Sequence, residues 1–162
     1  MGSAMMVRSY REGGVMMGGA RRARCFRDLI VYQKARDVAR RIFELSKEFP
    51  KEEVYSLTDQ GRRASRSVGA QIAEAWGKRR YERHFVSKLT DADSEQLETQ
   101  HWLETAFDCG YISEEQRDSL CRDLQEIGRM LNSMIEKAPS FCEPPSNKVR
   151  ENEPPDFFTD SY

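Results

Sequence analysis

The chain has 162 residues, of which 33% are charged and 38% hydrophobic, a length typical of one domain. No stretch approaches the roughly 18 consecutive apolar residues of a membrane span, and the N-terminal arginines are not followed by the apolar stretch of a secretory signal. We therefore expect a cytoplasmic protein without membrane contacts. The cysteines show no CxxC spacing, which favours reduced thiols in that compartment; they are Cys25, Cys109, Cys121 and Cys142.

The two ends of the chain differ in composition from its middle. Residues 1–25 are rich in Gly, Met and Arg, and residues 139–162 are acidic and hold five of the six prolines. Because such segments bury little apolar surface, we predict a disordered N-terminal extension over 1–25 and a disordered tail over 139–162. The folded domain is predicted over residues 26–138.

Four segments of this domain repeat apolar residues at alternating spacings of four and three, which predicts helices over 31–49, 57–75, 85–106 and 120–134. Pro50 is placed to end the first helix, Gly77 to stop the second and Gly110 to end the third. The fourth is preceded by Ser113 and Gln116, which fit a capping box.

A spacing that averages 3.5 residues is typical of helices packed along a left-handed seam. Links of about two to eight residues favour antiparallel neighbours. The sequence therefore predicts an all-α protein, an antiparallel up-down-up-down four-helix bundle, with a helical hairpin pair from a larger assembly as the alternative. The expected core comprises Val38, Ile42, Val68, Leu89, Leu103, Leu124 and Leu131.

The net charge of −1 hides an uneven distribution along the chain. Residues 1–88 hold 20 Lys and Arg against 10 Asp and Glu, whereas residues 89–162 hold 6 against 17. Lys and Arg gathered on one surface are typical of phosphate binding, because each neutralised phosphate releases counterions. We predict a nucleic-acid-binding surface, for RNA or DNA, formed by Arg62, Arg63, Arg66, Lys78, Arg79, Arg80 and Arg83.

The same arginines have a competing interpretation. Asp91, Glu95 and Glu98 form an acidic stripe on the third predicted helix, and they could neutralise the arginines within one subunit or across an interface. The protein would then be an interaction scaffold or accessory module with a protein partner. If the turn at residues 78–80 does not bind nucleic acid, the alternative surface is Arg36, Arg40 and Arg41.

The outer face of the second predicted helix points to a homo-oligomer. Opposite its apolar stripe, arginines alternate with Gly69, Ala70 and Ala73, and small residues there would let a second backbone approach closely. A glycine inside a helix costs roughly 1 kcal/mol relative to alanine, which suggests a contact at Gly69. Glu74 is predicted to form an intersubunit or intrahelical salt bridge.

No catalytic residue, metal site or cofactor is predicted. A di-metal bundle needs two Glu-x-x-His pairs, and only Glu98 with His101 matches, with His101 turned toward solvent. Cys109 and Cys121 lie too far apart along their helices for a disulfide, so buried thiols are expected there. Trp76 and Trp102 are expected to be packing anchors.

Several segments resemble the bacterial four-helix bundle proteins named for intervening sequences of 23S rRNA genes, and the resemblance covers about residues 26–138. The matching elements are Leu29–Ala35, Phe49–Glu53, Gln60 with Arg62, Arg63, Ala64 and Ser67, and Ile72–Glu74. Gln71 and Ala75 depart from the pattern, because many members have Asn and Gly there.

The resemblance implies a four-helix bundle that assembles into a ring-like homopentamer. It implies no known activity, because the family name records the genomic location of the genes, although a role with rRNA or ribosomes is suspected. A related bundle, the accessory protein of diversity-generating retroelements, binds nucleic acid and a reverse transcriptase, which is an analogy at the level of the fold.

Overall fold

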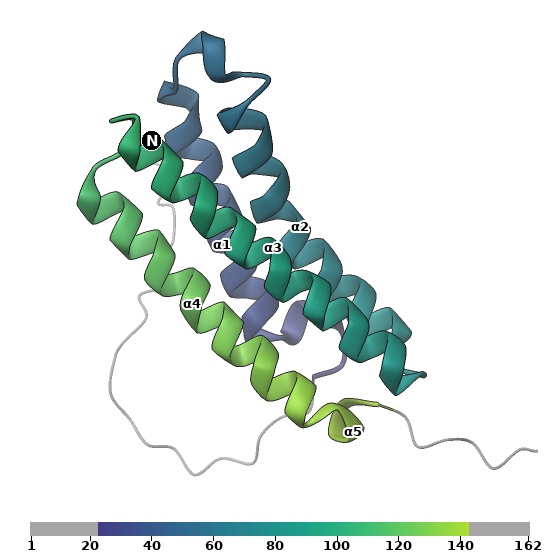
Figure 1. The fold of residues 1–162 in the computed structure, drawn as a ribbon. Coiled ribbons are helices and arrows are strands. Elements are labelled where there is room, and N and C mark those ends of the chain that lie inside the picture. The colour runs from purple at the N-terminus through teal and green to yellow at the C-terminus, as the bar shows by residue number, and fades with distance from the viewer. Residues whose placement is uncertain (1–22, 143–162) are drawn as a thin grey trace, which may run out of the picture.

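A computed structural model describes residues 23–142 of the chain, and the prediction of an all-helical protein is confirmed over this range. The four long helices are α1 (Ile30–Leu45), α2 (Leu57–Lys78), α3 (Glu82–Asp108) and α4 (Glu114–Glu136) (Figure 1). Short turns of helix are η1 (Phe26–Asp28), η2 (Ser46–Glu48), η3 (Lys51–Glu53) and α5 (Ala138–Phe141). The long helices fit a bundle.

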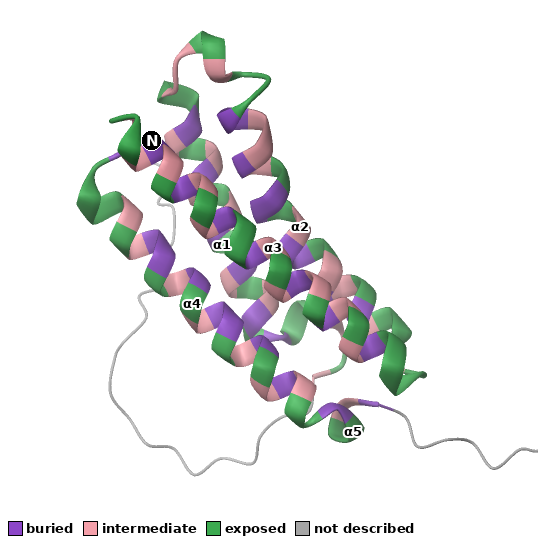
Figure 2. Ribbon diagram, in the orientation of Figure 1, coloured by how far each residue is buried: buried purple, intermediate pink, exposed green. Residues whose placement is uncertain are grey.

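Each long helix packs against the next one in the chain, and α1 also packs against α4. Buried and exposed residues alternate along each long helix, as expected when one side of a helix faces the core (Figure 2). The predicted apolar seam is confirmed, since Ile42 is only 6% exposed and Leu124 is fully buried. The other predicted core residues are also buried: Val38, Val68, Leu89, Leu103 and Leu131.

The helix ends agree with the sequence at two places and differ at two others. The capping box is present: the backbone N–H of Gln116 donates to Ser113 Oγ at 3.2 Å, and the backbone N–H of Ser113 donates to Gln116 Oε1 at 2.8 Å. Gly110 follows α3 with a φ of 75°, which favours glycine. Gly77 does not stop α2, which runs through it to Lys78.

The first predicted helix is also shorter than expected. α1 ends at Leu45, and the chain tightens into the 3-10 turn η2 before it reaches Pro50. In this turn Ser46 is buried, and its hydroxyl donates to the Phe43 carbonyl at 3.1 Å. Because a serine that bonds to the preceding turn competes with helical hydrogen bonds, it favours an end at this position.

The folded region extends beyond the predicted limits at both ends. Pro139 lies in the first turn of α5, where a missing N–H is tolerated, and Phe141 stacks on Phe85 with ring centroids 5.8 Å apart. At the other end, Asp28 Oδ2 accepts hydrogen bonds from the amides of Arg24 and Cys25. The disorder predicted for 23–25 and 139–142 is therefore wrong, and that predicted for 1–22 and 143–162 lies outside the described residues.

Candidate nucleic-acid interface

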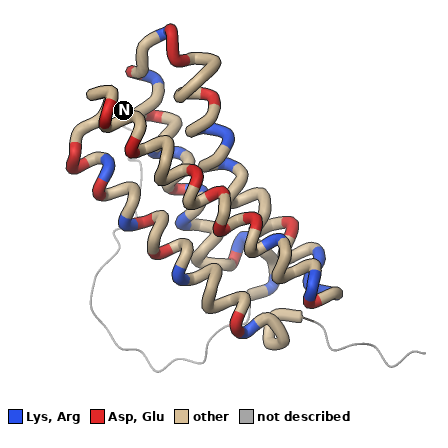
Figure 3. The backbone as a smooth tube through the Cα atoms, viewed as in Figure 1, with Lys and Arg blue, Asp and Glu red and all other residues tan. Residues whose placement is uncertain are grey.

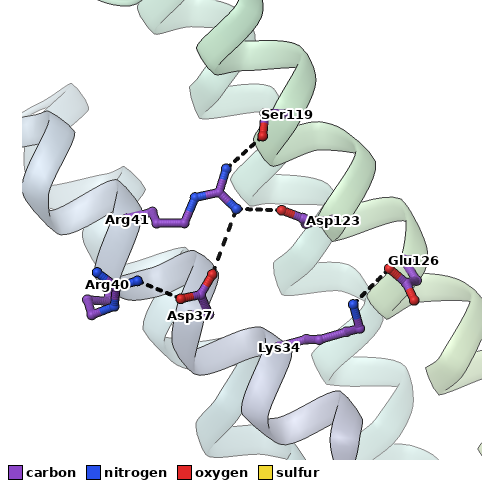
Figure 4. A network of polar contacts seen from close by, with 7 residues as sticks. All are labelled: Lys34, Asp37, Arg40, Arg41, Ser119, Asp123 and Glu126. Atoms are coloured by element: carbon purple, nitrogen blue, oxygen red, sulfur yellow. Dashed lines mark hydrogen bonds and ion pairs between the residues drawn. The ribbon is translucent and has the colours of Figure 1, made fainter. Parts of the chain in front are cut away.

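Ion pairs between α1 and α4 neutralise part of the excess positive charge of the N-terminal half (Figure 4). Lys34 Nζ lies 2.9 Å from Glu126 Oε2, and the Arg41 guanidinium contacts Asp123 and donates to Ser119 Oγ at 2.8 Å. Cations of the basic half thus pair with carboxylates of the acidic half inside one chain. These pairs hold the two helices together and leave Lys34 and Arg41 unsuited to bind an external phosphate.

Replacing Arg41 with alanine is expected to lower the free energy of unfolding by about 0.5–1 kcal/mol, because the pair with Asp123 is partly screened by water. The two side chains are 30% and 35% exposed. Urea denaturation of Arg41→Ala measures the effect. Arg40→Ala is the control, since its pair with Asp37 is 64% and 51% exposed and lies within α1. Equal losses for the two variants would show that the α1–α4 pair adds no stability of its own.

The arginines of α2 do not pair with the acidic stripe of α3 within the chain. Arg62 Nε donates to Ser46 Oγ at 2.7 Å, and the guanidinium groups of Arg62 and Arg66 lie 4.8 and 5.6 Å from the Phe43 ring centre. Arg63 contacts Asp59 on its own helix at 3.7 Å. These residues therefore pack against α1 or against their own helix, which corrects the predicted intrachain salt bridges.

The acidic stripe has partners of its own. Asp91 lies 3.1 Å from Lys88 Nζ, and Glu98 accepts a hydrogen bond from Trp102 Nε1 at 3.0 Å. Burial raises the pKa of the Glu95 carboxyl, its neighbours Glu98 and Asp91 raise it further, and Arg63 lowers it. The charge of Arg63 thus lowers the pKa of Glu95, although the ion pair of Arg63 is with Asp59 and not with Glu95. Pairing of these groups across a subunit interface stays a prediction.

A groove of about 360 Å³ lies between α1 and α2. Arg36 of α1 and Arg66 of α2 line it, both are exposed, and neither forms an ion pair with any residue between 23 and 142. We call it the α1–α2 groove, lined by Phe26, Tyr32, Ala35, Arg36, Ala39, Ser65, Arg66, Gly69, Ala70 and Ala73. From the sequence, Arg36 was predicted only as part of an alternative nucleic-acid-binding surface, and Phe26 and Tyr32 were not predicted as site residues.

The small residues of α2 occupy this groove in different ways. Gly69 is buried, and a Cβ there would lie at an ordinary contact distance, 3.7 Å, from the Tyr32 ring, so its contact with another subunit stays a prediction. Ala70 is exposed and Ala73 half-buried. Glu74 instead bonds to α3, with its carboxylate 3.2 Å from Lys88 Nζ, a pairing between helices of one chain that the sequence did not predict.

A second group of cations lies where α2 passes into α3, and we call residues 78–83 the basic turn (Figure 3). Lys78, Arg80 and Arg83 are exposed and, among the described residues, form no ion pair. Arg79 is half-buried, its guanidinium lies 4.3 Å from the Trp76 ring centre, and it donates to the Trp76 carbonyl at 2.7 Å. The basic turn also holds the exposed Glu82, but within the described residues this carboxylate forms no ion pair with Lys78, Arg80 or Arg83.

The two features lie along the same helix. Twelve residues separate Arg66 from Lys78, which is about 18 Å at 1.5 Å per residue. Such a length matches several phosphates of one strand at about 3.4 Å each along the axis. We call the α1–α2 groove and the basic turn together the candidate interface.

Other candidate chemistry gains no support from the geometry. Between residues 23 and 142, no group of three or more His, Cys, Asp or Glu side chains is placed to hold a metal ion. All four cysteines are free, and Cys109 is exposed, so its predicted burial is wrong because it lies past the last turn of α3. Burial raises the pKa of the Cys121 and Cys142 thiols. None of the helices in this range has the apolar length that crossing a bilayer requires.

Comparison with known proteins places the chain in a family. The model of the 23S rRNA-intervening sequence protein family matches residues 27–133. A solved structure of a protein of unknown function, from the S23 ribosomal protein family of Bacteroides thetaiotaomicron, is 34% identical with a TM-score of 0.60, over 66% of this chain and 96% of that chain. No curated protein matches the sequence. Because the family match spans more than half of the sequence, the chain belongs to the 23S rRNA-intervening sequence protein family.

Proposed function

We propose that the protein is a non-enzymatic, cytoplasmic bundle that binds nucleic acid, RNA above all, through the candidate interface. One observation carries this proposal: the fold neutralises Lys34 and Arg41 with carboxylates but leaves the exposed Arg36, Arg66 and Lys78 without ion pairs between residues 23 and 142. Keeping like charges together on a surface is unfavourable unless a ligand neutralises them, and phosphates do so with release of counterions.

The bundle is also proposed to be a homo-oligomer with alternating helix directions, a homopentamer as the family resemblance implies. The short links, residues 79–81 and 109–113, support the alternating directions. The exposed Ala70 and the half-buried Ala73 leave room on α2 for a second subunit. Arg63, which does not line the α1–α2 groove, would then be the α2 arginine that pairs with a neighbour's acidic stripe. Light scattering on the full chain should give a mass near five times 18.8 kDa, and a mass near one subunit would contradict the proposal.

A protein-interaction scaffold is the second candidate, and the α1–α2 groove favours it. Its lining combines Phe26 and Tyr32 with small side chains such as Ala39, which is a surface that the apolar side chains of a partner could fill. An RNA ligand and a protein ligand differ in their response to salt, because only phosphate binding releases the condensed counterions of a nucleic acid.

The binding of a fluorescently labelled RNA hairpin to the full chain, measured by anisotropy, tests the first candidate. We expect binding at about 50 mM salt, with the logarithm of the affinity falling linearly with that of the salt concentration, by about 0.7–0.9 per phosphate contacted. Absence of binding at about 50 mM salt would overturn the proposal, because phosphate contacts are strongest at low ionic strength.

A further inference from the structure

The basic turn carries an exposed aromatic side chain that packing does not explain. Tyr81 is 59% exposed, and its ring lies 5.6 Å from that of His84, centre to centre. Among residues 23–142, Tyr55 and Tyr81 are the only exposed Phe, Tyr or Trp side chains. Tyr55 lies in the link between η3 and α2, whereas Tyr81 lies among the unpaired cations of the basic turn.

Helix capping does not explain Tyr81 either. The residue occupies the N-cap position of α3, and its side chain makes no capping hydrogen bond. Ser, Thr, Asp and Asn are preferred there, because their oxygens satisfy free N–H groups of the first turn. A tyrosine therefore gives up local stability at this position, and its exposed ring is the feature that needs a function.

A second flat group lies close to it in the chain. The Arg79 guanidinium lies over the Trp76 ring at 4.3 Å and is tied by its donation to the Trp76 carbonyl. Packing against the indole thus restrains this planar cation. Unpaired bases stack on aromatic rings and on guanidinium planes, and their phosphates bind the cations alongside.

We infer that the basic turn binds an unpaired nucleotide, with the Tyr81 ring as the surface on which the base stacks and Lys78, Arg80 and Arg83 as the partners of the adjoining phosphates. This inference rests on the proposed function, and it names the ligand class as single-stranded RNA or a loop. A base inside an uninterrupted duplex already stacks on its neighbours, and the deep, narrow major groove of A-form RNA keeps side chains from reading it.

The test compares a labelled 12-nucleotide single strand with an uninterrupted duplex of the same sequence, each titrated with the full chain at about 50 mM salt. We expect the single strand to bind about tenfold more tightly. Tyr81→Ala should lose about that factor for the single strand and leave the duplex affinity and both salt slopes unchanged, because it removes no phosphate contact. Tyr81→Phe should bind like the wild type, since it keeps the ring, and it also controls for the folding of α3.

Tyr55→Ala is the matched control, because it removes an exposed tyrosine away from the basic turn, and it should change neither affinity. A fluorescent adenine analogue in the single strand provides a spectroscopic readout: its emission should fall on binding to the wild type and not on binding to Tyr81→Ala. Equal affinities for strand and duplex, or a Tyr81→Ala variant that binds and quenches like the wild type, would overturn the inference alone. Failure of both RNAs to bind the wild type would overturn the proposed function as well.

Discussion

Replacing Lys78, Arg79 and Arg80 together with alanine is expected to weaken RNA binding by about tenfold or more at low salt. The loss should be similar for different sequences, because contacts to phosphates carry no sequence information. The slope of log affinity against log salt should also become shallower, by up to about 0.7–0.9 for each lost phosphate contact. Anisotropy titrations at several salt concentrations measure both quantities.

A variant with the same change in charge provides the control for this experiment. Lys51, Arg122 and Arg129 are exposed and lie outside the candidate interface, so their joint replacement with alanine should affect binding much less. If both triple variants bind equally weakly, net charge and not the basic turn determines the affinity. If the variant without Lys78, Arg79 and Arg80 binds like the wild type, the binding site does not include the basic turn.

Replacing Leu124 with alanine is expected to lower the free energy of unfolding by about 2–5 kcal/mol. The side chain lies in α4 and is fully buried in the core, so the smaller residue loses apolar burial and leaves a cavity. Urea denaturation measures the loss. Leu97→Ala is the control, because Leu97 is 57% exposed, and its replacement should change stability by about 0.5 kcal/mol or less. Similar losses for the two variants would contradict the assignment of the seam.

The helices and their core were predictable from the sequence because both depend on local spacing. Apolar spacings that alternate between four and three residues place Leu124 and Ile42 on inner helix faces, whatever the neighbouring helix is. Ser113 and Gln116 form a cap within a single turn. The end of α1 was less predictable. It depends on the bonds of the buried Ser46, one of which comes from Arg62 of another helix.

The candidate site was predictable in part. Lys78 ends α2 and Arg80 lies in the short link to α3, where few side chains come close, so composition alone indicated exposed cations. The partners of Arg62 and Arg41 depend on how neighbouring helices are rotated about their axes, which spacing within one helix does not determine. Arg41 and Asp123 are 82 residues apart in the chain, and only the packing of α1 on α4 brings them together.

The α1–α2 groove illustrates the same limit. A helical wheel places Gly69 about 120° from Leu57, away from the apolar stripe, which suggested a contact with another subunit. In the folded chain Tyr32 of α1 covers Gly69, because α1 packs against α2 on the flank that holds this glycine. The helical wheel of α2 alone could not show this neighbour within the chain, and a contact of Gly69 with a second subunit stays a prediction.

Cross-linking of bound RNA to the full chain tests where RNA binds, since it identifies the contact surface and not only the affinity. RNA containing 4-thiouridine is bound at about 50 mM salt, irradiated and digested, and the modified peptides are identified by mass spectrometry. We expect cross-links in peptides of the basic turn around Tyr81 and of the α1–α2 groove around Phe26 and Tyr32. Cross-links confined to the outer face of α4, around Arg122 and Arg129, would contradict it.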